Sequence, residues 1–250
     1  MAPGNERLTF QYRFKFSDGS IKHFALHLDP VTLGLIRDPT PSYPEWTRLN
    51  YHQCPNCPLK QETTPHCPVA VNLVGVVDTF KDVLSHEQAE VEIRSPERTY
   101  SARTALQTAI GSLIGLHMAT SGCPVLDKLR PMVRTHLPFA TAEETMYRVI
   151  SMYLLGQFFR YRRGLLPDWD LKNLVKTYED VQSVNKAFVE RLSSLAIQDA
   201  SMNAVVILDC FAATTNFSIM SDSLNEIEQL FGAYLKKEGT TGEKENPRRG

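Results

Sequence analysis

The chain lacks several features that would place it in a broad functional class. Its 250 residues contain 27 Lys and Arg against 28 Asp and Glu, so it has no basic excess of the kind that nonspecific nucleic-acid binding requires. It contains no uninterrupted run of about 18 apolar residues, and a membrane span is therefore not expected. The first residues contain no apolar signal core, which favours a cytoplasmic location.

Common catalytic signatures are also missing. The sequence has no Gly-rich phosphate loop and no Gly-x-Ser-x-Gly or His-Glu-x-x-His motif. It also has no Glu-x-x-His pair, which a di-iron helical bundle would need. Cysteine is scarce at five residues, which argues against a disulfide framework. The sequence therefore leaves open whether the protein is an enzyme.

The N-terminal part is predicted to form a small sheet. Apolar and polar residues alternate over 8–16, Asp18-Gly19 supplies a turn, and the alternation resumes over 24–28. This pattern is typical of a β-hairpin with one buried face. A shorter alternation over 89–94 predicts one further strand.

Helical periodicity dominates the rest of the chain. A capping box at Thr141 and Glu144 marks the start of one helix, and Gly164 marks its end. The stretch 200–217 is apolar nearly all round, which predicts a buried central helix. The other predicted helices cover residues 69–84, 104–121 and 223–234.

Two series of residues recur every seven positions between residues 171 and 195. One series is Leu171, Tyr178, Asn185 and Leu192, and the other is Leu174, Val181, Phe188 and Leu195. A heptad seam with one polar position is typical of paired helices. The seam 171–195 therefore predicts a homodimer or a protein partner.

We predict an α+β protein, in which a small N-terminal antiparallel sheet (a hairpin plus one strand) packs on a C-terminal bundle of six or seven helices. Residues 1–100 would contain the sheet, the first helix and a loop over 37–68 that is rich in Pro and polar residues. Residues 101–235 would form the bundle. The polar tail 236–250 is predicted to be disordered.

Four of the five cysteines are followed directly by proline. They are Cys54, Cys57, Cys67 and Cys123, whereas Cys210 precedes Phe. Proline accounts for only about one residue in twenty in average proteins. The repeated Cys-Pro dipeptide therefore indicates a shared role for these four residues.

The segment Cys54-Pro55-Asn56-Cys57 looks like the Cys-Pro-x-Cys half-site of rubredoxins and zinc ribbons. Those sites usually carry Gly after the second cysteine, and Pro58 stands at that position here. A proline directly after the first cysteine removes an amide that such a half-site does not need, and its fixed φ stiffens the loop.

The other two Cys-Pro dipeptides are predicted to begin helices. Pro68 and Pro124 each stand where proline is favoured as the first helical residue, which places Cys67 and Cys123 at N-cap positions. A helix N-terminus favours the thiolate, which is the form that binds metal. We therefore predict a four-cysteine metal centre that pins the 37–68 loop onto the bundle, with a structural or redox-sensory role.

Several alternatives stay open. Zn²⁺ and an iron–sulfur cluster both accept four thiolates, and the sequence does not separate them. His52 or His66 would complete the site if Cys123 lay elsewhere. The cysteines could also form a redox-active pair, bind haem through exposed Cys-Pro dipeptides, or be inert.

A rival hypothesis is an enzyme with a pocket in the helical bundle near His117, Asp209 and Asn203. All three lie in apolar helical segments. A buried carboxylate needs a partner or its pKa rises, so Asp209 is also explained by a structural ion pair with Arg130, Arg134 or Arg148. His117 is also explained as a satisfied core histidine.

Four segments of the chain resemble an uncharacterised bacterial protein family of about this length. They are PEWTRLNYHQCPNCPL, HCPVAVNL, ATSGCPVLDKLRPM and LPFATAEETMYR. The resemblance extends from Tyr12 to Phe217. It implies that this region is one unit and that the protein is bacterial, and it transfers no catalytic residues.

Overall fold

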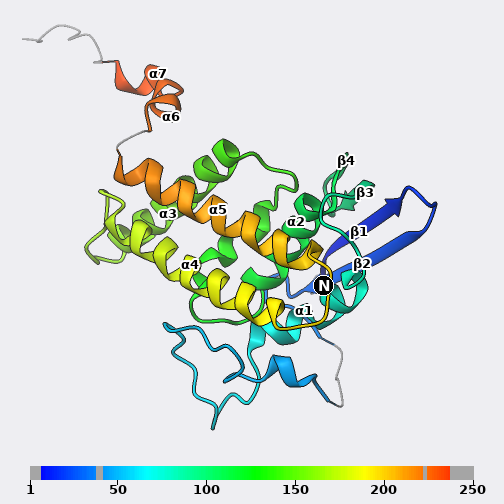
Figure 1. Ribbon diagram of the computed structural model, residues 1–250. Helices are drawn as coiled ribbons and strands as arrows, with labels where there is room; N and C mark the ends of the chain where they lie inside the picture. The colour runs from blue at the N-terminus through cyan, green and yellow to red at the C-terminus, as the bar shows by residue number, and fades with distance from the viewer. Residues whose placement is uncertain (1–6, 38–41, 222–223, 237–250) are drawn as a thin grey trace, which may run out of the picture.

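Four antiparallel strands form the N-terminal sheet of the computed structural model, and they lie in the order β2-β1-β3-β4 (Figure 1). Their bounds are β1 (Leu8–Phe16), β2 (Ile21–Leu28), β3 (Gln88–Arg94) and β4 (Thr99–Ala105). The predicted α+β class, hairpin and further strand are confirmed. The sequence analysis missed β4 because TYSARTA has no apolar alternation, and none of its side chains is fully buried.

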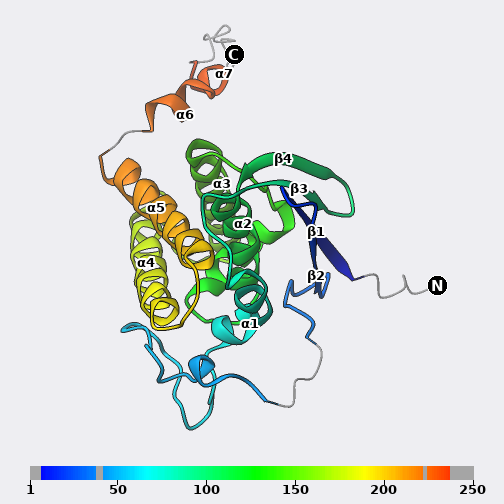
Figure 2. The same ribbon diagram turned by 45° about the vertical axis from the view of Figure 1, so that its right-hand side comes forward.

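The structure describes residues 7–37, 42–221 and 224–236. Within them the chain forms seven α-helices and two 3-10 helices. Their bounds are η1 (Glu45–Thr47), α1 (Pro68–Phe80), α2 (Leu106–Ala119), η2 (Leu126–Thr135), α3 (Ala142–Arg162), α4 (Lys172–Ser193), α5 (Ala200–Met220), α6 (Asn225–Gln229) and α7 (Gly232–Leu235). α5 packs against α2 and α4, and Figures 1 and 2 both show α4 and α5 side by side.

The sheet and the helices share one hydrophobic core. The apolar side chains at alternate positions of β1 are buried, and Phe14 contacts Phe80 of α1 with the ring centroids 5.0 Å apart. The same continuous cluster includes residues of α2, α3, α4 and α5. The division into two parts near residue 100 stays a prediction.

The capping box at the start of α3 is confirmed in both halves. The main-chain N–H of Glu144 donates to Thr141 Oγ1 at 3.1 Å, and the N–H of Thr141 donates to Glu144 Oε2 at 2.8 Å. Gly164 follows the helix with a φ of 72°. That left-handed conformation strains any residue with a Cβ, which explains why glycine ends the helix.

The heptad seam lies on α4 and is buried within the chain. Its buried members are Leu171, Leu174, Tyr178, Val181, Asn185, Phe188 and Leu192. They pack into the core that α4 shares with α5. Pairing with a partner through 171–195 stays a prediction, and it would have to displace these internal contacts.

The expectation that the helix over 200–217 is buried on all sides is wrong. Phe217 is 71% exposed and Met220 is 72% exposed, because α5 has neighbours on only part of its circumference. By length and composition, α5 is the one helix among the described residues that is apolar enough to cross a membrane. Within the most apolar stretch of this helix, 28% is buried inside the protein.

The predicted last helix over 223–234 consists of two short helices, α6 and α7. Phe231, between them, stacks on Tyr147 of α3 with the ring centroids 6.5 Å apart. The predicted disorder of the tail concerns residues that lie, from 237 onward, outside the described part of the chain.

Candidate metal centre

The cysteine-rich loop, residues 42–67 of the described chain, is held against α4. Asn56 Nδ2 donates to the main-chain oxygen of Asp180 at 2.9 Å, and the hydroxyl groups of Tyr51 and Ser194 share a hydrogen bond of 2.7 Å. A long Pro-rich loop needs such attachments in order to adopt one conformation. α4 and the residue after it supply them, which no local pattern in the sequence indicated.

Cys67 lies where the sequence predicted it. It is the N-cap residue of α1, with extended backbone angles, and Pro68 is the first residue of the helix. Its main-chain N–H donates to the oxygen of Thr47 in η1 at 2.7 Å. This bond ties the start of α1 to the beginning of the cysteine-rich loop.

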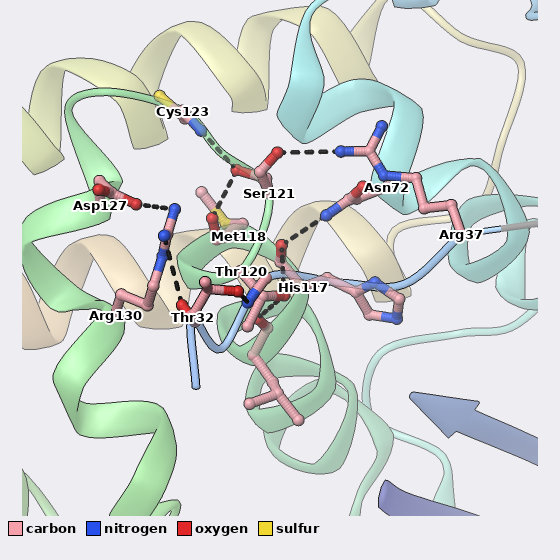
Figure 3. Close-up of polar contacts among 12 residues, drawn as sticks. Thr32, Arg37, Asn72, His117, Met118, Thr120, Ser121, Cys123, Asp127 and Arg130 are labelled. Carbon is pink, nitrogen blue, oxygen red and sulfur yellow. Dashed lines mark hydrogen bonds and ion pairs between the residues drawn. The ribbon is translucent and has the colours of Figure 1, made fainter. Parts of the chain in front are cut away.

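Cys123 is positioned by a tight turn after α2 (Figure 3). Gly122 adopts a φ of 83°, which reverses the chain, and the N–H of Cys123 donates to Ser121 Oγ at 3.1 Å. The Ser121 hydroxyl donates in turn to the oxygen of Met118 at 2.7 Å. The end of α2 therefore fixes the position of Cys123.

The prediction that Pro124 opens an α-helix is wrong. The residues after Cys123 form a turn, and the helix that follows is the 3-10 helix η2, which begins at Leu126. Burial raises the pKa of the Cys123 thiol, and hydrogen bonds from the main chain of Leu126 and Val125 lower it. The turn therefore presents amides to the sulfur much as a helix N-terminus would.

The four cysteines of the Cys-Pro dipeptides line one small cavity of about 20 Å³. They are Cys54, Cys57, Cys67 and Cys123. All are free thiols, and no group of three or more His, Cys, Asp or Glu side chains among the described residues is arranged to hold a metal ion. The sulfurs thus share a cavity without forming a coordination shell, and metal ligation stays a prediction.

The thiol of Cys54 is held in its protonated form. Its pKa is raised to about 12, first by burial and then by Cys67, Cys57 and Cys123, because thiolates so close together would repel one another. This mutual effect shows that the four groups are electrostatic neighbours. A cation placed among them would favour four thiolates over four thiols.

Arg191 of α4 lines the same cavity and is only 1% exposed. Nη1 donates to the oxygens of Trp46 at 2.5 Å and Arg48 at 2.9 Å, and Nη2 donates to the oxygen of His52 at 3.4 Å. Its guanidinium carbon lies 5.7 Å from the centroid of the Tyr51 ring. The side chain therefore fastens the loop to α4.

No carboxylate of the described residues forms an ion pair with Arg191. Burial lowers the pKa of Arg191, and the groups that raise it are led by Cys67, Cys54 and Tyr51. A buried arginine ordinarily has an anionic partner. The ionisable groups that favour the charged form of Arg191 are instead cysteine thiols and the Tyr51 phenol.

The two histidines predicted as substitute ligands have different positions. His52 lines the cavity, and its Nδ1 lies 4.0 Å from Oε2 of Glu190. His66 is not among the described residues that line the cavity, and its Nδ1 shares a hydrogen bond of 2.8 Å with Thr47 Oγ1. Of the two, His52 is therefore the one placed near the four sulfurs.

The residues of the rival enzyme hypothesis do not line the larger cavity of the described bundle. The bundle contains a larger cavity, but His117, Asp209 and Asn203 are not among the described residues that line it. Burial lowers the pKa of His117 to about 4. Asn203 Nδ2 donates to Ser85 Oγ at 3.0 Å and to Asp199 Oδ2 at 2.9 Å, which gives it a structural role.

The ion pair predicted for Asp209 is absent from the described residues. Arg130 pairs with Asp127 instead, and Arg148 donates to the main-chain oxygen of Thr135 at 2.7 Å. Burial raises the pKa of Asp209, whereas Lys186 and the Asn185 side chain lower it.

Sequence reasoning missed Arg191, although a signal for it was present. Thr177, Val184 and Arg191 form a third series at seven-residue spacing on the same helix, and all three are buried. Arg191 is the charged member of that series. A charge in a buried heptad position indicates either a partner or a site.

A family model described as a domain of unknown function, DUF6901, matches residues 10–232. The match includes the sheet from β1 onward, the cysteine-rich loop, the Cys123 turn and the helices as far as the start of α7. No curated protein and no solved structure matches the chain significantly. The bacterial origin implied by the resemblance stays a prediction.

Proposed function

We propose that this chain, which belongs to the DUF6901 family, binds one divalent metal ion through Cys54, Cys57, Cys67 and Cys123. The metal serves to lock the cysteine-rich loop, the start of α1 and the Cys123 turn onto α4. The observation that carries the proposal is the presence of these four sequence-distant cysteines around a single cavity.

The size of the cavity favours a single ion over a cluster. Its volume of about 20 Å³ is close to that of one water molecule, which needs roughly 10–15 Å³ of such space. Zinc takes four thiolates at about 2.3 Å in a tetrahedron, so the sulfurs need to draw together only around one atom. A cluster of four irons with its bridging sulfides would require the walls to move apart.

The charge of the surroundings also supports the proposal. Four thiolates around a divalent ion carry a net charge of −2, and binding releases the thiol protons. Arg191, buried beside the cavity without a carboxylate partner among the described residues, supplies one compensating positive charge. The helix-like amides at Cys123 add a smaller contribution of the same sign.

The other roles considered for the cysteines fit less well. A redox-active cysteine needs a lowered pKa, whereas the pKa of Cys54 is raised. Haem ligation by separate Cys-Pro dipeptides would need exposed thiols, whereas Cys123 is 7% exposed and shares its cavity with the others.

The test is anaerobic purification of the full chain, followed by elemental analysis and an absorption spectrum. The expected product is colourless and contains one zinc per chain. Replacement of the zinc by Co²⁺ should give the intense sulfur-to-metal bands and visible absorption of a tetrahedral thiolate site. A protein that purifies without stoichiometric metal and takes up neither ion would contradict the proposal.

Cysteine variants separate ligation from general thiol chemistry. Cys54→Ser should lose metal binding and lower the melting temperature, because removing one of four ligands opens the coordination shell. Cys210→Ser is the matched control, since Cys210 is exposed on α5 and does not line the cavity. Equal metal content in the two variants would refute the assignment of Cys54 as a ligand.

A further inference from the structure

A second, larger cavity lies within the helical part of the molecule. Its volume is about 200 Å³, and its walls are formed by α2, η2, α3, α4 and α5 together with the loop between η2 and α3. It is separate from the cysteine cavity, because the described residues that line the two cavities are all different. Nothing in the proposed metal centre accounts for it.

The walls of this larger cavity are mostly apolar. They include side chains such as Leu129, Met132 and Phe211, and the small residues Gly111 and Gly115 of α2 also line the cavity where α5 packs closely on α2. An engineered apolar cavity of about 150 Å³ binds benzene. A space of about 200 Å³ therefore accommodates an aromatic ring system or a short branched chain.

Arg148 of α3 is the one charged residue among the described residues that line the cavity. Its Nη2 donates to the oxygens of Met132 at 3.2 Å and Thr135 at 2.7 Å, while its buried Nε has no hydrogen-bond partner in the described part of the chain. No carboxylate of the described residues forms an ion pair with it. Glu144, the acidic residue that influences its pKa, is engaged in the capping box.

The other polar groups that line the cavity near Arg148 are neutral. His136 lines the cavity, and its Nε2 shares a hydrogen bond of 2.6 Å with the hydroxyl of Tyr12, which in turn accepts from Ser112 Oγ at 3.4 Å. Burial and the nearby guanidinium lower the pKa of His136 and keep it uncharged, and burial raises the pKa of the Tyr178 hydroxyl. This end of the cavity therefore presents one uncompensated positive charge and hydroxyl donors.

Backbone strain beside the cavity is a further feature typical of a binding site. Phe139, in the loop that lines the cavity, has a φ of 60°, which is strained for a residue with a bulky side chain. Strained residues and unsatisfied buried donors concentrate where a ligand completes the structure. The strain at Phe139 and the unpartnered Nε of Arg148 occur at the same cavity.

We propose that this cavity binds a small apolar molecule that ends in a carboxylate, with the apolar body between α2 and α5 and the carboxylate at Arg148. The guanidinium Nε and the Tyr178 hydroxyl are the groups that would donate to the carboxylate oxygens. Charge-assisted hydrogen bonds of this kind are the strong ones in proteins.

The test uses three probes that share one ring system, namely 2-naphthoate, 2-naphthamide and 2-naphthylmethylamine. Each is titrated into the full-length protein as purified and followed by fluorescence and calorimetry. We expect saturable 1:1 binding of the carboxylate, weaker binding of the amide and none of the amine. Equal affinity for all three would overturn the carboxylate assignment, and no saturable binding of any probe would overturn the site.

Three variants locate the binding. Arg148→Gln should weaken naphthoate binding about ten- to hundredfold, as expected for loss of a charged hydrogen bond, and should leave naphthamide binding much less affected. Arg162→Gln is the matched control, because Arg162 lies on the same helix and is exposed. Ala119→Leu places three more carbons at the wall and should abolish binding of the carboxylate and the amide without lowering the melting temperature. Unchanged naphthoate binding in both Arg148→Gln and Ala119→Leu would place the probe elsewhere and refute the proposal.

Discussion

Replacement of Arg191 by methionine tests how the cysteine-rich loop is attached to α4. Methionine keeps most of the apolar volume of the side chain and removes all of its hydrogen bonds. The bond to the main-chain oxygen of Trp46 is buried and the bond to that of Arg48 is partly buried, so both oxygens would lose a charged donor, and the Trp46 oxygen would do so without gaining water. Hydrogen bonds to a charged group contribute about 1.5–3 kcal/mol each. The expected loss in the free energy of unfolding is therefore about 3–6 kcal/mol, a large share of the roughly 5–15 kcal/mol of a typical domain.

Urea unfolding followed by circular dichroism measures this loss. With a slope of at most about 3 kcal/mol per molar urea, the midpoint should fall by about 1 M or more. Arg162→Met on the exposed face of α3 is the control and should change the stability by less than about 0.5 kcal/mol. A loss below about 1 kcal/mol for Arg191→Met would show that the three carbonyl oxygens find other partners, and the role assigned to Arg191 would be wrong.

A second substitution at this position tests the charge argument for the metal centre. Arg191→Lys keeps the positive charge but cannot reproduce the fork of donors to the loop. If Arg191 balances a dianionic site, the lysine variant should hold zinc more tightly than the methionine variant, even where both are destabilised. Competition with a chelator of known affinity measures the difference. Equal zinc affinity in the two variants would remove the electrostatic part of the argument.

Three further predictions concern the fold. His136 has a pKa of about 3 when folded and about 6.5 when unfolded, so the unfolded state binds more protons between these values. His136 should therefore lower the stability as pH drops from 6.5 to 3, by up to about 1.4 kcal/mol per unit, and His136→Gln should reduce the slope by that amount in unfolding measurements, leaving the contribution of His117 above pH 4. Thr141→Ala removes one half of the capping box and should cost about 0.5–2 kcal/mol, whereas Thr141→Ser keeps the hydroxyl and should cost much less. Phe80→Ala empties the space beside Phe14 and Phe24 and should cost about 3–5 kcal/mol in the same assay; a loss below about 1 kcal/mol would contradict the packing described.

Local patterns in the sequence were sufficient to predict many of the regular elements. The alternation in β1, the capping box of α3 and the Cys67-Pro68 start of α1 each depend on neighbours a few residues apart, and the structure contains all three. β4 was missed because an edge strand without a fully buried face has no such alternation. The last predicted helix is divided in two, which its periodicity did not indicate.

The candidate site depended on long-range contacts, and only part of it could be predicted. The unusual frequency of Cys-Pro indicated which cysteines belong together, and these four line one cavity. Arg191 is distant in sequence from all four, and its role depends on how α4 packs against the loop. The lining of the larger cavity could not be predicted either, because its walls come from five helices and its polar end combines Arg148 with His136 and Tyr178. Each of these residues is ordinary in its local context.

α4 connects the two proposed sites. Val184 and Phe188 line the cysteine cavity, and Val181 and Asn185 line the larger one, so adjacent turns of one helix contribute to both. Metal binding that locks the loop onto α4 should reduce the motion of that helix and thereby raise the affinity for naphthoate. A coupling free energy of at least about 1 kcal/mol, which is typical between two sites, corresponds to an increase of about fivefold or more. Linkage then requires saturating naphthoate to raise the metal affinity by the same factor. Calorimetry of naphthoate with zinc-loaded and chelator-treated protein gives the first ratio, and Co²⁺ titration with and without naphthoate gives the second. Two equal ratios above one would establish the coupling, whereas ratios of one would show that α4 behaves as a rigid wall between independent sites.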